Sequence, residues 1–324
     1  MRRALAVLIG SLAALGTAQV DAQVPASYPA KPVRIVNPFA PGGNTDIVSR
    51  AIAERLTPVF KQQVIVEHRP GAMTNIASEA VAKAPPDGYM LLMGGASNAI
   101  NMSFLAKPPY DTLRDLDPVI LCYKGANVLA IHPSLPVKNL SELIQLAKAQ
   151  PGKLNYASSG LGSSNQMAGE LFKMMAKVNV EHVPYKGNAP ALVDTVGGHV
   201  HMLFAGIPSL LPHVQSGRLR AIAISTLQRA PAMPRVPTFD ESGLKGYEAT
   251  NWFGLLAPAK TPKDVIARLN TEIERVIKAA DMRERFTGEG LETAGGPPET
   301  FGRFLRLEIA KYARVIQAAG IARQ

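Results

Sequence analysis

The chain has 324 residues, 47% of them hydrophobic, with a single cysteine and a formal net charge of +10. One cysteine excludes an intramolecular disulfide, and the length exceeds the ~250–300 residues at which one core usually divides, so we expect two lobes stabilised by core burial. The basic residues are scattered and aromatic residues make up only 6% of the chain, which argues against a nucleic-acid-binding surface but allows a general attraction for small anions.

The N-terminus has the form of a secretory signal peptide. A basic start, Met1-Arg2-Arg3, precedes an apolar run over residues 4–15, and Val20-Asp21-Ala22 fits a cleavage site. The alternative, an N-terminal membrane anchor, is disfavoured because the run is much shorter than the ~20 apolar residues that span a bilayer. We therefore expect residues 1–22 to be removed and the mature protein to be exported and soluble.

A glycine loop between a strand and a helix is the first candidate site. The apolar run 33–36 predicts a strand, the apolar spacing over 44–60 predicts a helix, and a segment from Pro38 to Asp46 with two adjacent glycines connects them. Backbone N–H groups at a helix N-terminus are unpaired, and the helix dipole favours an anion there. We therefore predict that the loop holds a carboxylate, with Asp46 either capping the helix or accepting a hydrogen bond in the cleft.

Strands and helices then alternate, which predicts βαβ units and a mainly parallel sheet. In such sheets ligands bind beyond the carboxyl ends of the strands, and three predicted strands end in loops at that edge. The strands cover 33–36, 64–67 and 89–93, a helix covers 74–84, and the loops cover 38–46, 67–72 and 94–98.

The middle of the chain repeats the opening pattern. A short strand at 154–157 is followed by a loop at 158–164 and a predicted helix at 165–176. The loop contains four serines and two glycines, so we expect its hydroxyl and N–H groups to donate hydrogen bonds to an anion without an ionic partner. An ordinary flexible turn is the alternative, and the similar loop at 38–46 favours the binding site.

The remaining elements complete the lobes and end in helices. Three prolines between 228 and 237 indicate a linker. Strands are predicted at 117–121, 127–131, 180–185, 199–205, 220–225 and 251–257, and helices are predicted to begin at 140, 191, 262 and 298.

Motifs for nucleotide binding and catalysis are missing from the sequence. The chain has no P-loop, no Gly-x-Gly-x-x-Gly after a strand and no Gly-x-Ser-x-Gly elbow. A hydrolase using a serine of 158–164 is an alternative that lacks a base and an acid partner. His199 and His201 share one strand face, which is more typical of a solvated face than of half a metal site. Cys122 lies in an apolar strand and is expected to be a buried thiol. We therefore expect no enzyme, no metal and no cofactor.

Six sequence blocks occur in order along residues 29–320. They are PFAPGG at 38–43 with Asp46 and Arg50, HRPGA at 68–72, PPDGY at 85–89, SSGLGS at 158–163, HVPYKG at 182–187, and WFG at 252–254 with Ala257-Pro258. Together they resemble the signatures of the Bug (TctC-type) family, the periplasmic substrate-binding proteins of tripartite tricarboxylate transporters.

The resemblance implies a fold. It is an α/β periplasmic binding protein of the two-lobed, type II clamshell kind, each lobe a mainly parallel sheet flanked by helices. On this chain, lobe I is expected over 29–124 and lobe II over 125–225. A return to lobe I with C-terminal helices is expected over 226–324, with hinge crossings near 120–130 and 220–230.

The resemblance also implies a carboxylate held between the two glycine loops by backbone N–H groups, hydroxyls and ordered waters. Neither loop contains an arginine, so the number of ligand carboxylates stays open. Two departures from the family pattern, Met73-Thr74 and His199, leave the shape of the far end of the pocket open. The expected ligand-binding residues are Phe39, Ala40, Gly42, Gly43 and Asp46 in the first loop, Ser158, Ser159, Gly162, Ser163 and Ser164 in the second, and Asn98, Gly206 and Pro208 in the walls.

The implied function is capture of a small organic carboxylate in the periplasm and its delivery to inner-membrane permease subunits. The alternative is a periplasmic sensing module that presents the bound carboxylate to a sensor kinase ectodomain. No nucleic-acid partner is expected.

Overall fold

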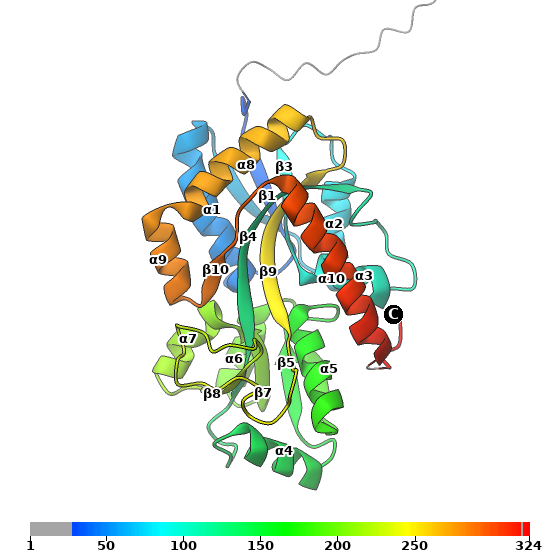
Figure 1. Cartoon of the computed structure of the whole chain (residues 1–324), viewed down its shortest axis with the longest axis vertical. Coiled ribbons are helices and arrows are strands. Elements are labelled where there is room, and N and C mark those ends of the chain that lie inside the picture. Colours follow the sequence, from blue (N-terminus) through cyan, green and yellow to red (C-terminus); the bar gives the residue numbers. More distant parts are fainter. Residues whose placement is uncertain (1–27, 319) are drawn as a thin grey trace, which may run out of the picture.

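The computed structural model describes residues 28–318 and 320–324, so the expected signal peptide at 1–22 lies outside the described residues. Two lobes are stacked along the long axis of the molecule, and two long strands pass between them (Figure 1). Within the described ranges, no helix has both the length and the apolar character needed to cross a bilayer.

The first lobe is built on a mixed sheet with the strand order β2–β1–β3–β9–β4–β10. Helices α1, α8 and α9 pack on one face of it and α2, α3 and α10 on the other. The strands are β1 (Val33–Asn37), β2 (Val64–His68), β3 (Met90–Gly95), β4 (Leu116–Ile131), β9 (Thr250–Pro258) and β10 (Leu291–Thr293). The helices are α1 (Asn44–Phe60), the 3₁₀ turn η1 (Ala72–Thr74), α2 (Asn75–Ala82), α3 (Ala96–Phe104), α8 (Lys263–Lys278), α9 (Ala280–Gly288) and α10 (Pro298–Ala318).

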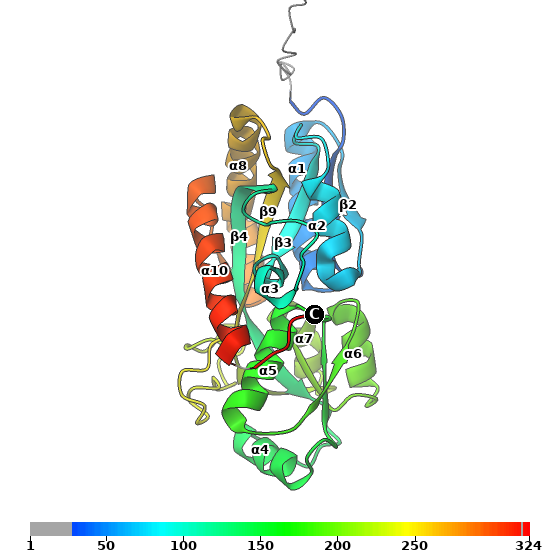
Figure 2. The same ribbon diagram turned by 90° about the vertical axis from the view of Figure 1, so that its right-hand side faces the viewer.

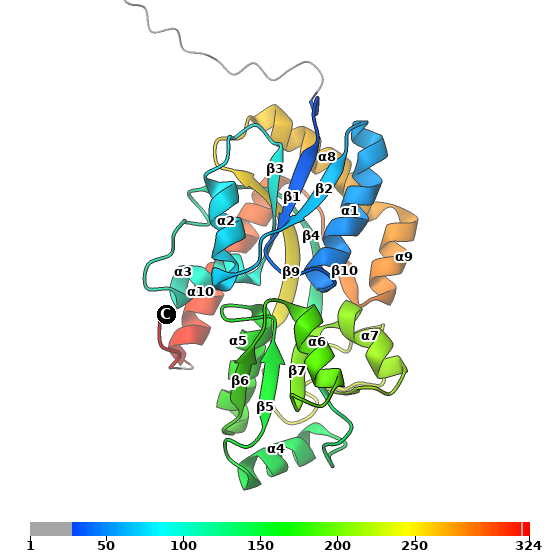
Figure 3. The same cartoon turned by 180° about the vertical axis from the view of Figure 1, so that it is seen from behind.

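The second lobe has the strand order β8–β4–β7–β5–β6, and its helices surround this sheet (Figures 2 and 3). Helices α4 and α5 contribute to the core on one face, and α6 and α7 to the core on the other. The elements are α4 (Leu140–Ala149), β5 (Asn155–Ser158), α5 (Ser164–Ala176), β6 (Glu181–Pro184), α6 (Asn188–Val196), β7 (Met202–Gly206), α7 (Ile207–Gln215) and β8 (Arg220–Ile224).

The helix that follows the first glycine loop forms where its sequence predicts. The apolar side chains of Val48, Ile52 and Leu56 recur at helical spacing and are buried in the first core. The helix ends at Phe60, because Lys61 adopts a left-handed conformation with φ of 52°. Gly43 stands just before its first residue, so the loop and the helix start are fixed relative to the sheet by a fully packed helix face.

Two crossing strands make both sheets mixed, where the sequence predicted mainly parallel ones. β4 runs antiparallel to β9 and β10 in the first lobe and antiparallel to β7 and β8 in the second. Only the strands of the βαβ units are parallel, as in β1 with β2 and β3, and in β5 with β6 and β7. The cause is the path of the chain: it leaves the first lobe in β4 and returns in the neighbouring β9. The two strands predicted at 117–121 and 127–131 are one 16-residue strand with irregular register.

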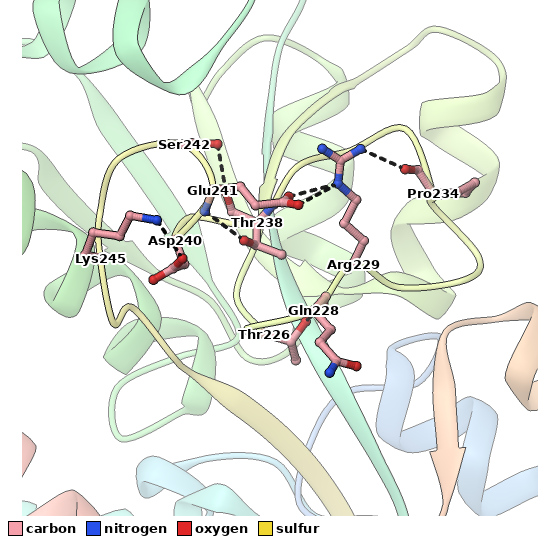
Figure 4. A network of polar contacts seen from close by, with 9 residues as sticks. All are labelled: Thr226, Gln228, Arg229, Pro234, Thr238, Asp240, Glu241, Ser242 and Lys245. Carbon is pink, nitrogen blue, oxygen red and sulfur yellow. Dashed lines mark hydrogen bonds and ion pairs between the residues drawn. The ribbon is translucent and has the colours of Figure 1, made fainter.

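The segment between β8 and β9 packs with the second lobe. The expected lobe boundary at 225/226 and the expected second hinge crossing at 220–230 therefore both move to about 250. The prolines of this segment indicated a linker, but Phe239 and Tyr247 are buried in the second core, where their rings stack with centroids 4.0 Å apart. The Tyr247 hydroxyl donates to the Ala168 carbonyl at 2.6 Å. Polar contacts stabilise the segment (Figure 4). Arg229 pairs with Glu241 at 2.8 Å, the Thr238 N–H donates to the Glu241 carboxylate, and the Glu241 N–H donates to the Thr238 hydroxyl.

Several element boundaries differ from those that the sequence predicted. The loop expected at 94–98 contains the start of α3, and the turn expected around Gly206 and Pro208 is the start of α7. Helix α6 begins at Asn188, before the predicted start at 191. In each case a helix starts directly after a glycine that ends a strand or loop, so the connections are shorter than the sequence pattern suggested.

Candidate functional site

A cavity of about 30 Å³ lies where the two lobes meet, beside the crossing strand β9. Its walls come from the first residues of α1, α3, α5 and α6 and from the ends of β3 and β9. None of the described residues that line it carries a charge. The lining residues are Pro38, Phe39, Gly43, Asn44, Thr45, Met93, Gly94, Gly95, Ala96, Ser97, Asn98, Ser159, Ser163, Ser164, Asn165, Asn188, Asn251, Trp252 and Phe253.

Four helix N-termini therefore contribute to one cavity. Helices α1, α3 and α6 begin after Gly43, Gly95 and Gly187, which have no side chain to cap the first turn. At α3 the Asn98 side chain accepts from the Gly95 N–H, so this one donor is already used. Of these four helices, α5 alone has an N-cap residue whose side chain accepts from the first turn: Ser163 Oγ accepts from the Gln166 N–H. Uncapped helix starts leave N–H donors unpaired, and each helix dipole adds positive partial charge. The chemistry of this cavity is therefore suited to an anion held by neutral donors.

Asp46 stabilises the first loop through a hydrogen bond to its backbone and does not line the cavity. Its carboxylate accepts hydrogen bonds from the Gly42 N–H at 2.8 Å, from Arg50 Nε at 3.0 Å and from His68 Nε2 at 2.8 Å. Burial opposes its ionisation, but the hydrogen bonds from Gly42, Arg50 and His68 outweigh that and lower the pKa of Asp46. Gly42 has a φ of 85°, a left-handed conformation that suits glycine. Asp46 therefore fixes the loop shape and leaves the loop's free donors for a ligand.

The second loop uses most of its hydroxyl groups internally, contrary to the expectation that its serines donate to the anion. Ser163 Oγ donates to the Gly160 carbonyl at 2.6 Å, and Ser159 Oγ donates to Asn165 Oδ1 at 2.6 Å. Ser158 is fully buried and bonds Gly160 and His182. Of the four serines, only Ser164 has no hydrogen bond from its hydroxyl among the described residues. Donors for an anion here are chiefly backbone N–H groups.

The two lobes touch directly around the cavity. The Ala40 N–H donates to the Lys186 carbonyl at 2.9 Å, and the Ser209 N–H donates to Asn44 Oδ1 at 2.9 Å. A Cβ atom placed on Gly162 would lie 2.5 Å from Asn101 Oδ1, so these residues also meet closely across the lobes. The structure is therefore a closed arrangement.

The predicted site residues divide into two groups. Six of them line the cavity: Phe39, Gly43, Asn98, Ser159, Ser163 and Ser164. The others, Ala40, Gly42, Asp46, Ser158, Gly162, Gly206 and Pro208, lie outside the lining. Of these, Gly162 and Gly206 pack against the opposite lobe, and Pro208 lies in the first turn of α7.

Asn98 lines the wall, but its amide is fully used within lobe I. Its Oδ1 accepts from the Gly95 N–H at 3.0 Å, and its Nδ2 donates to Ser78 Oγ and to the Tyr110 hydroxyl, each at 3.0 Å. Because all three partners are in the same lobe, Asn98 holds the start of α3 in place.

Sequence reasoning missed part of the lining. Asn44, Thr45 and Asn165 occupy the first turns of helices that were predicted, so the rule that a helix start faces the anion could have found them. Asn188 was missed because α6 was expected to begin later. Three lining residues of β9 were not expected in the site, although two of them belong to the WFG block, because their position is set by the crossing between the lobes; they are Asn251, Trp252 and Phe253.

A serine–histidine pair lies beneath the second loop, so the expectation that a serine of this loop lacks a base was wrong. Ser158 Oγ is 2.7 Å from His182 Nε2, and the His182 ring stacks on Tyr156 with centroids 4.8 Å apart. Ser158 nevertheless has no exposed surface and is absent from the cavity lining. The pair therefore holds the loop and does not present a nucleophile to the cavity.

We expect this pair to make folding stability sensitive to acid. Burial lowers the pKa of His182 to about 4, with Glu170 opposing and Lys173 adding to the shift. Between about pH 6.5 and pH 4 the unfolded chain binds a proton that the folded protein does not. The free energy of unfolding therefore decreases as the pH is lowered through this range, by at most roughly 3 kcal/mol. The lowered pKa of Asp46 adds a further loss at lower pH.

Chemical denaturation at pH 7 and pH 4.5 measures this effect. His182→Gln is the matched control, because it keeps a hydrogen-bonding side chain but cannot titrate. We expect a clearly smaller pH dependence in the variant, and equal dependence in both proteins would contradict the assignment.

Other reactive side chains lie away from the cavity. Burial raises the pKa of the Cys122 thiol to about 12, which fits the inert thiol that the sequence predicted. Within residues 28–318 and 320–324, no group of three His, Cys, Asp or Glu side chains is placed to hold a metal ion.

Comparison with known proteins gives this architecture a family. A family model described as "Tripartite tricarboxylate transporter family receptor" (TctC) matches residues 48–321. Protein BugT of Bordetella pertussis strain Tohama I is 36% identical over 323 residues, which cover 99% of this chain and 98% of BugT.

Two solved structures share the fold and carry ligands named in their descriptions. R. palustris Rpa4515 with adipate has a TM-score of 0.89 and 36% identity, covering 91% of this chain and 99% of that one. MatC (Rpa3494) from Rhodopseudomonas palustris with bound malate has a TM-score of 0.86 and 31% identity, and the match covers 89% of this chain and 100% of MatC. The two-lobed fold, the cavity between the lobes and these matches together show that the chain belongs to the TctC (Bug) family of periplasmic solute-binding proteins.

Proposed function

We propose that this protein captures a small organic carboxylate between its two lobes and delivers it to a membrane permease. The observation that carries the proposal is the cavity at the lobe interface, where four helix N-termini converge and no described lining residue is charged. Helix N-termini favour an anion, because their free N–H groups donate to it and the helix dipole adds positive partial charge. A phosphate site would be expected to add lysine or arginine side chains, as phosphate-binding loops do.

The two lobes contribute different groups to the proposed binding site. The first lobe contributes the backbone around Gly43 and Asn44 and the start of α3, and the second contributes the starts of α5 and α6. A ligand that contacts both lobes stabilises the closed arrangement by the difference between its affinities for the closed and open forms. Binding and closure are therefore expected to be one coupled event.

Two relatives support a carboxylate as the ligand class. Rpa4515 has been solved with adipate and MatC with malate, and both have the same fold as this chain. The family description names a transporter receptor, so we propose delivery to a permease in preference to presentation to a sensor kinase. The proposed place of action is the periplasm, and the proposed role is binding without catalysis.

A thermal-shift panel tests the ligand class. The panel contains adipate, malate, succinate, citrate, benzoate and glutamate, with adipamide as the neutral counterpart of adipate. We expect at least one carboxylate to raise the unfolding temperature, since a ligand at 100 times its dissociation constant stabilises the fold by about 2.7 kcal/mol. We expect no shift with adipamide, because an amide lacks the charge that the helix N-termini stabilise. No shift with any carboxylate, or an equal shift with adipamide, would contradict the proposal.

A further inference from the structure

A buried chain of side-chain hydrogen bonds connects the crossing strands to the cavity. Ser159 Oγ donates to Asn165 Oδ1 at 2.6 Å, Asn165 Nδ2 donates to Asn127 Oδ1 at 2.9 Å, and Asn127 Nδ2 donates to the carbonyl oxygen of Ala249 at 2.9 Å. Asn127 lies in β4 and has no exposed surface, and Ala249 directly precedes β9. We call these four residues the Asn127 relay. Its far end, Ser159 with Asn165, lines the cavity.

The direction of every hydrogen bond in the relay is fixed from the Ala249 end. A backbone carbonyl can only accept, so the Asn127 group facing it must be the NH₂. The Asn127 oxygen then faces Asn165 and can only accept, which orients the Asn165 amide in turn. The Asn165 oxygen therefore faces Ser159, and the Ser159 hydroxyl must use its hydrogen there.

This polarity decides what Ser159 can bind. Its hydrogen is directed at Asn165, so only the lone pairs of its oxygen remain for the cavity. Lone pairs repel a carboxylate oxygen and attract an O–H donor. We propose that Asn127 is a positioning residue that holds Ser159 as a hydrogen-bond acceptor, so that the second loop receives an O–H donor beside the bound carboxylate. The donor is a hydroxyl of the ligand or an ordered water that in turn donates to the carboxylate. The inference rests on the proposed carboxylate function.

Breaking the relay removes this control. Without the Asn127 side chain, the Asn165 amide can reverse and Ser159 can turn its hydrogen into the cavity, where it would oppose an incoming donor. The relay lies within the second lobe and the crossing strands, so hinge motion need not break it. Its effect on binding is therefore one of preorganisation, present before the ligand arrives.

Ser225 provides a matched control at the same junction. Its hydroxyl donates to the Ala249 carbonyl at 2.6 Å and accepts from the Asn127 N–H at 2.8 Å, and Ser225 is as completely buried as Asn127. Ser225 thus contacts both Asn127 and Ala249, but its side chain does not belong to the hydrogen-bond chain that leads to Ser159. Ser225→Ala therefore disturbs the packing of the crossing strands and leaves the relay intact.

A double-mutant cycle on ligand affinity tests the proposal. Malate and succinate are titrated calorimetrically into the wild type, Asn127→Ala, Ser159→Ala, the double variant and Ser225→Ala. We expect Asn127→Ala and Ser159→Ala each to weaken binding roughly three- to tenfold, the range of one hydrogen bond. The double variant should bind no more weakly than Ser159→Ala alone, because Asn127 acts through Ser159. Ser225→Ala should bind within about twofold of wild type, a change below that range.

The two probes separate the sources of the donor. A larger loss for malate than for succinate in Ser159→Ala assigns the donor to the ligand hydroxyl, and equal losses assign it to a bridging water. Additive losses in the double variant, or a loss in Ser225→Ala as large as in Asn127→Ala, would overturn the proposal.

A measurement without ligand keeps the relay testable even if neither probe binds. The side-chain NH₂ protons of Asn165 are expected to exchange slowly with solvent in the wild type and in Ser225→Ala, and faster in Asn127→Ala. Unchanged Asn165 exchange in Asn127→Ala overturns the relay. If the Asn165 protons exchange as expected in all three proteins but no carboxylate binds, the relay stands and the result counts against the proposed function.

Discussion

Gly206→Ala is expected to weaken carboxylate binding about a hundredfold or more while leaving the protein folded. Gly206 has a φ of −73° and a ψ of 156°, which alanine adopts without strain. Its added Cβ, however, would lie 2.3 Å from Asn44 Nδ2 and 3.1 Å from Asn44 Cγ on the opposite lobe. Asn44 is buried, and its Oδ1 is held by the Ser209 N–H at 2.9 Å, so it cannot move away without losing a cross-lobe hydrogen bond. The overlap exists only when the lobes are closed.

The size of the effect follows from linkage between closure and binding. A hundredfold loss corresponds to about 2.8 kcal/mol of destabilisation of the closed form. Isothermal titration with a carboxylate that stabilises the wild type gives the affinity, and denaturation gives the stability. Gly302→Ala is the matched control, because its Cβ would meet Pro118 Cγ at an ordinary 3.5 Å. Wild-type affinity in Gly206→Ala would show that binding does not require the contact between α1 and α7.

Gly43→Val should weaken carboxylate binding by a similar factor, through the first glycine loop. Gly43 precedes the first residue of α1, lines the cavity, and has an extended conformation that valine tolerates. A Cβ there would be 3.6 Å from both Asn188 Cβ and Asn188 N, so alanine just fits, but the two further methyl groups of valine would enter the small cavity or press on α6. We expect a loss of about a hundredfold or more, equivalent to about 2.8 kcal/mol, with unchanged stability.

Gly43→Ala is the control in this series, since it removes the glycine without filling the cavity. We expect it to bind within about threefold of the wild type, a difference below 1 kcal/mol. Equal affinity of the wild type, the alanine and the valine variants would mean that this loop does not face the ligand.

The sequence predicts much of the first lobe, because its local signals agree with its packing. The strand at 33–36, the two glycines and the helix at 44–60 appear in the structure with almost the same bounds. The expected family is confirmed by the TctC model and by BugT. Each of these predictions depends on residues that are close in the sequence.

The failures come from contacts that join distant segments. Proline spacing suggested a linker after β8, but Phe239 and Tyr247 pack into the second core and carry the chain to Ala249 before it crosses back. The serines at 158–164 looked like free donors, yet their hydroxyl directions depend on partners elsewhere, such as Asn165 and His182. Polarity inside a buried network is a property of the whole network, so no local pattern reveals it.

The position of the site was predictable, but its complete lining was not. Glycine loops at helix starts identified Gly43 and the region of Ser163, because the N–H groups in the first turn of a helix have the same chemistry wherever the helix occurs. Asn188 and Trp252 enter the cavity only through the start of α6 and the path of β9. These two depend on how the lobes meet, which is a tertiary feature.

Small-angle X-ray scattering on the wild type and Gly206→Ala, with and without a saturating carboxylate from the thermal-shift panel, tests the central claim most directly. If the protein closes on its ligand, the radius of gyration of the wild type will fall when the carboxylate is added, and that of Gly206→Ala will stay at the open value. A wild type that binds the carboxylate by calorimetry but keeps the same scattering curve would contradict capture by closure of the two lobes.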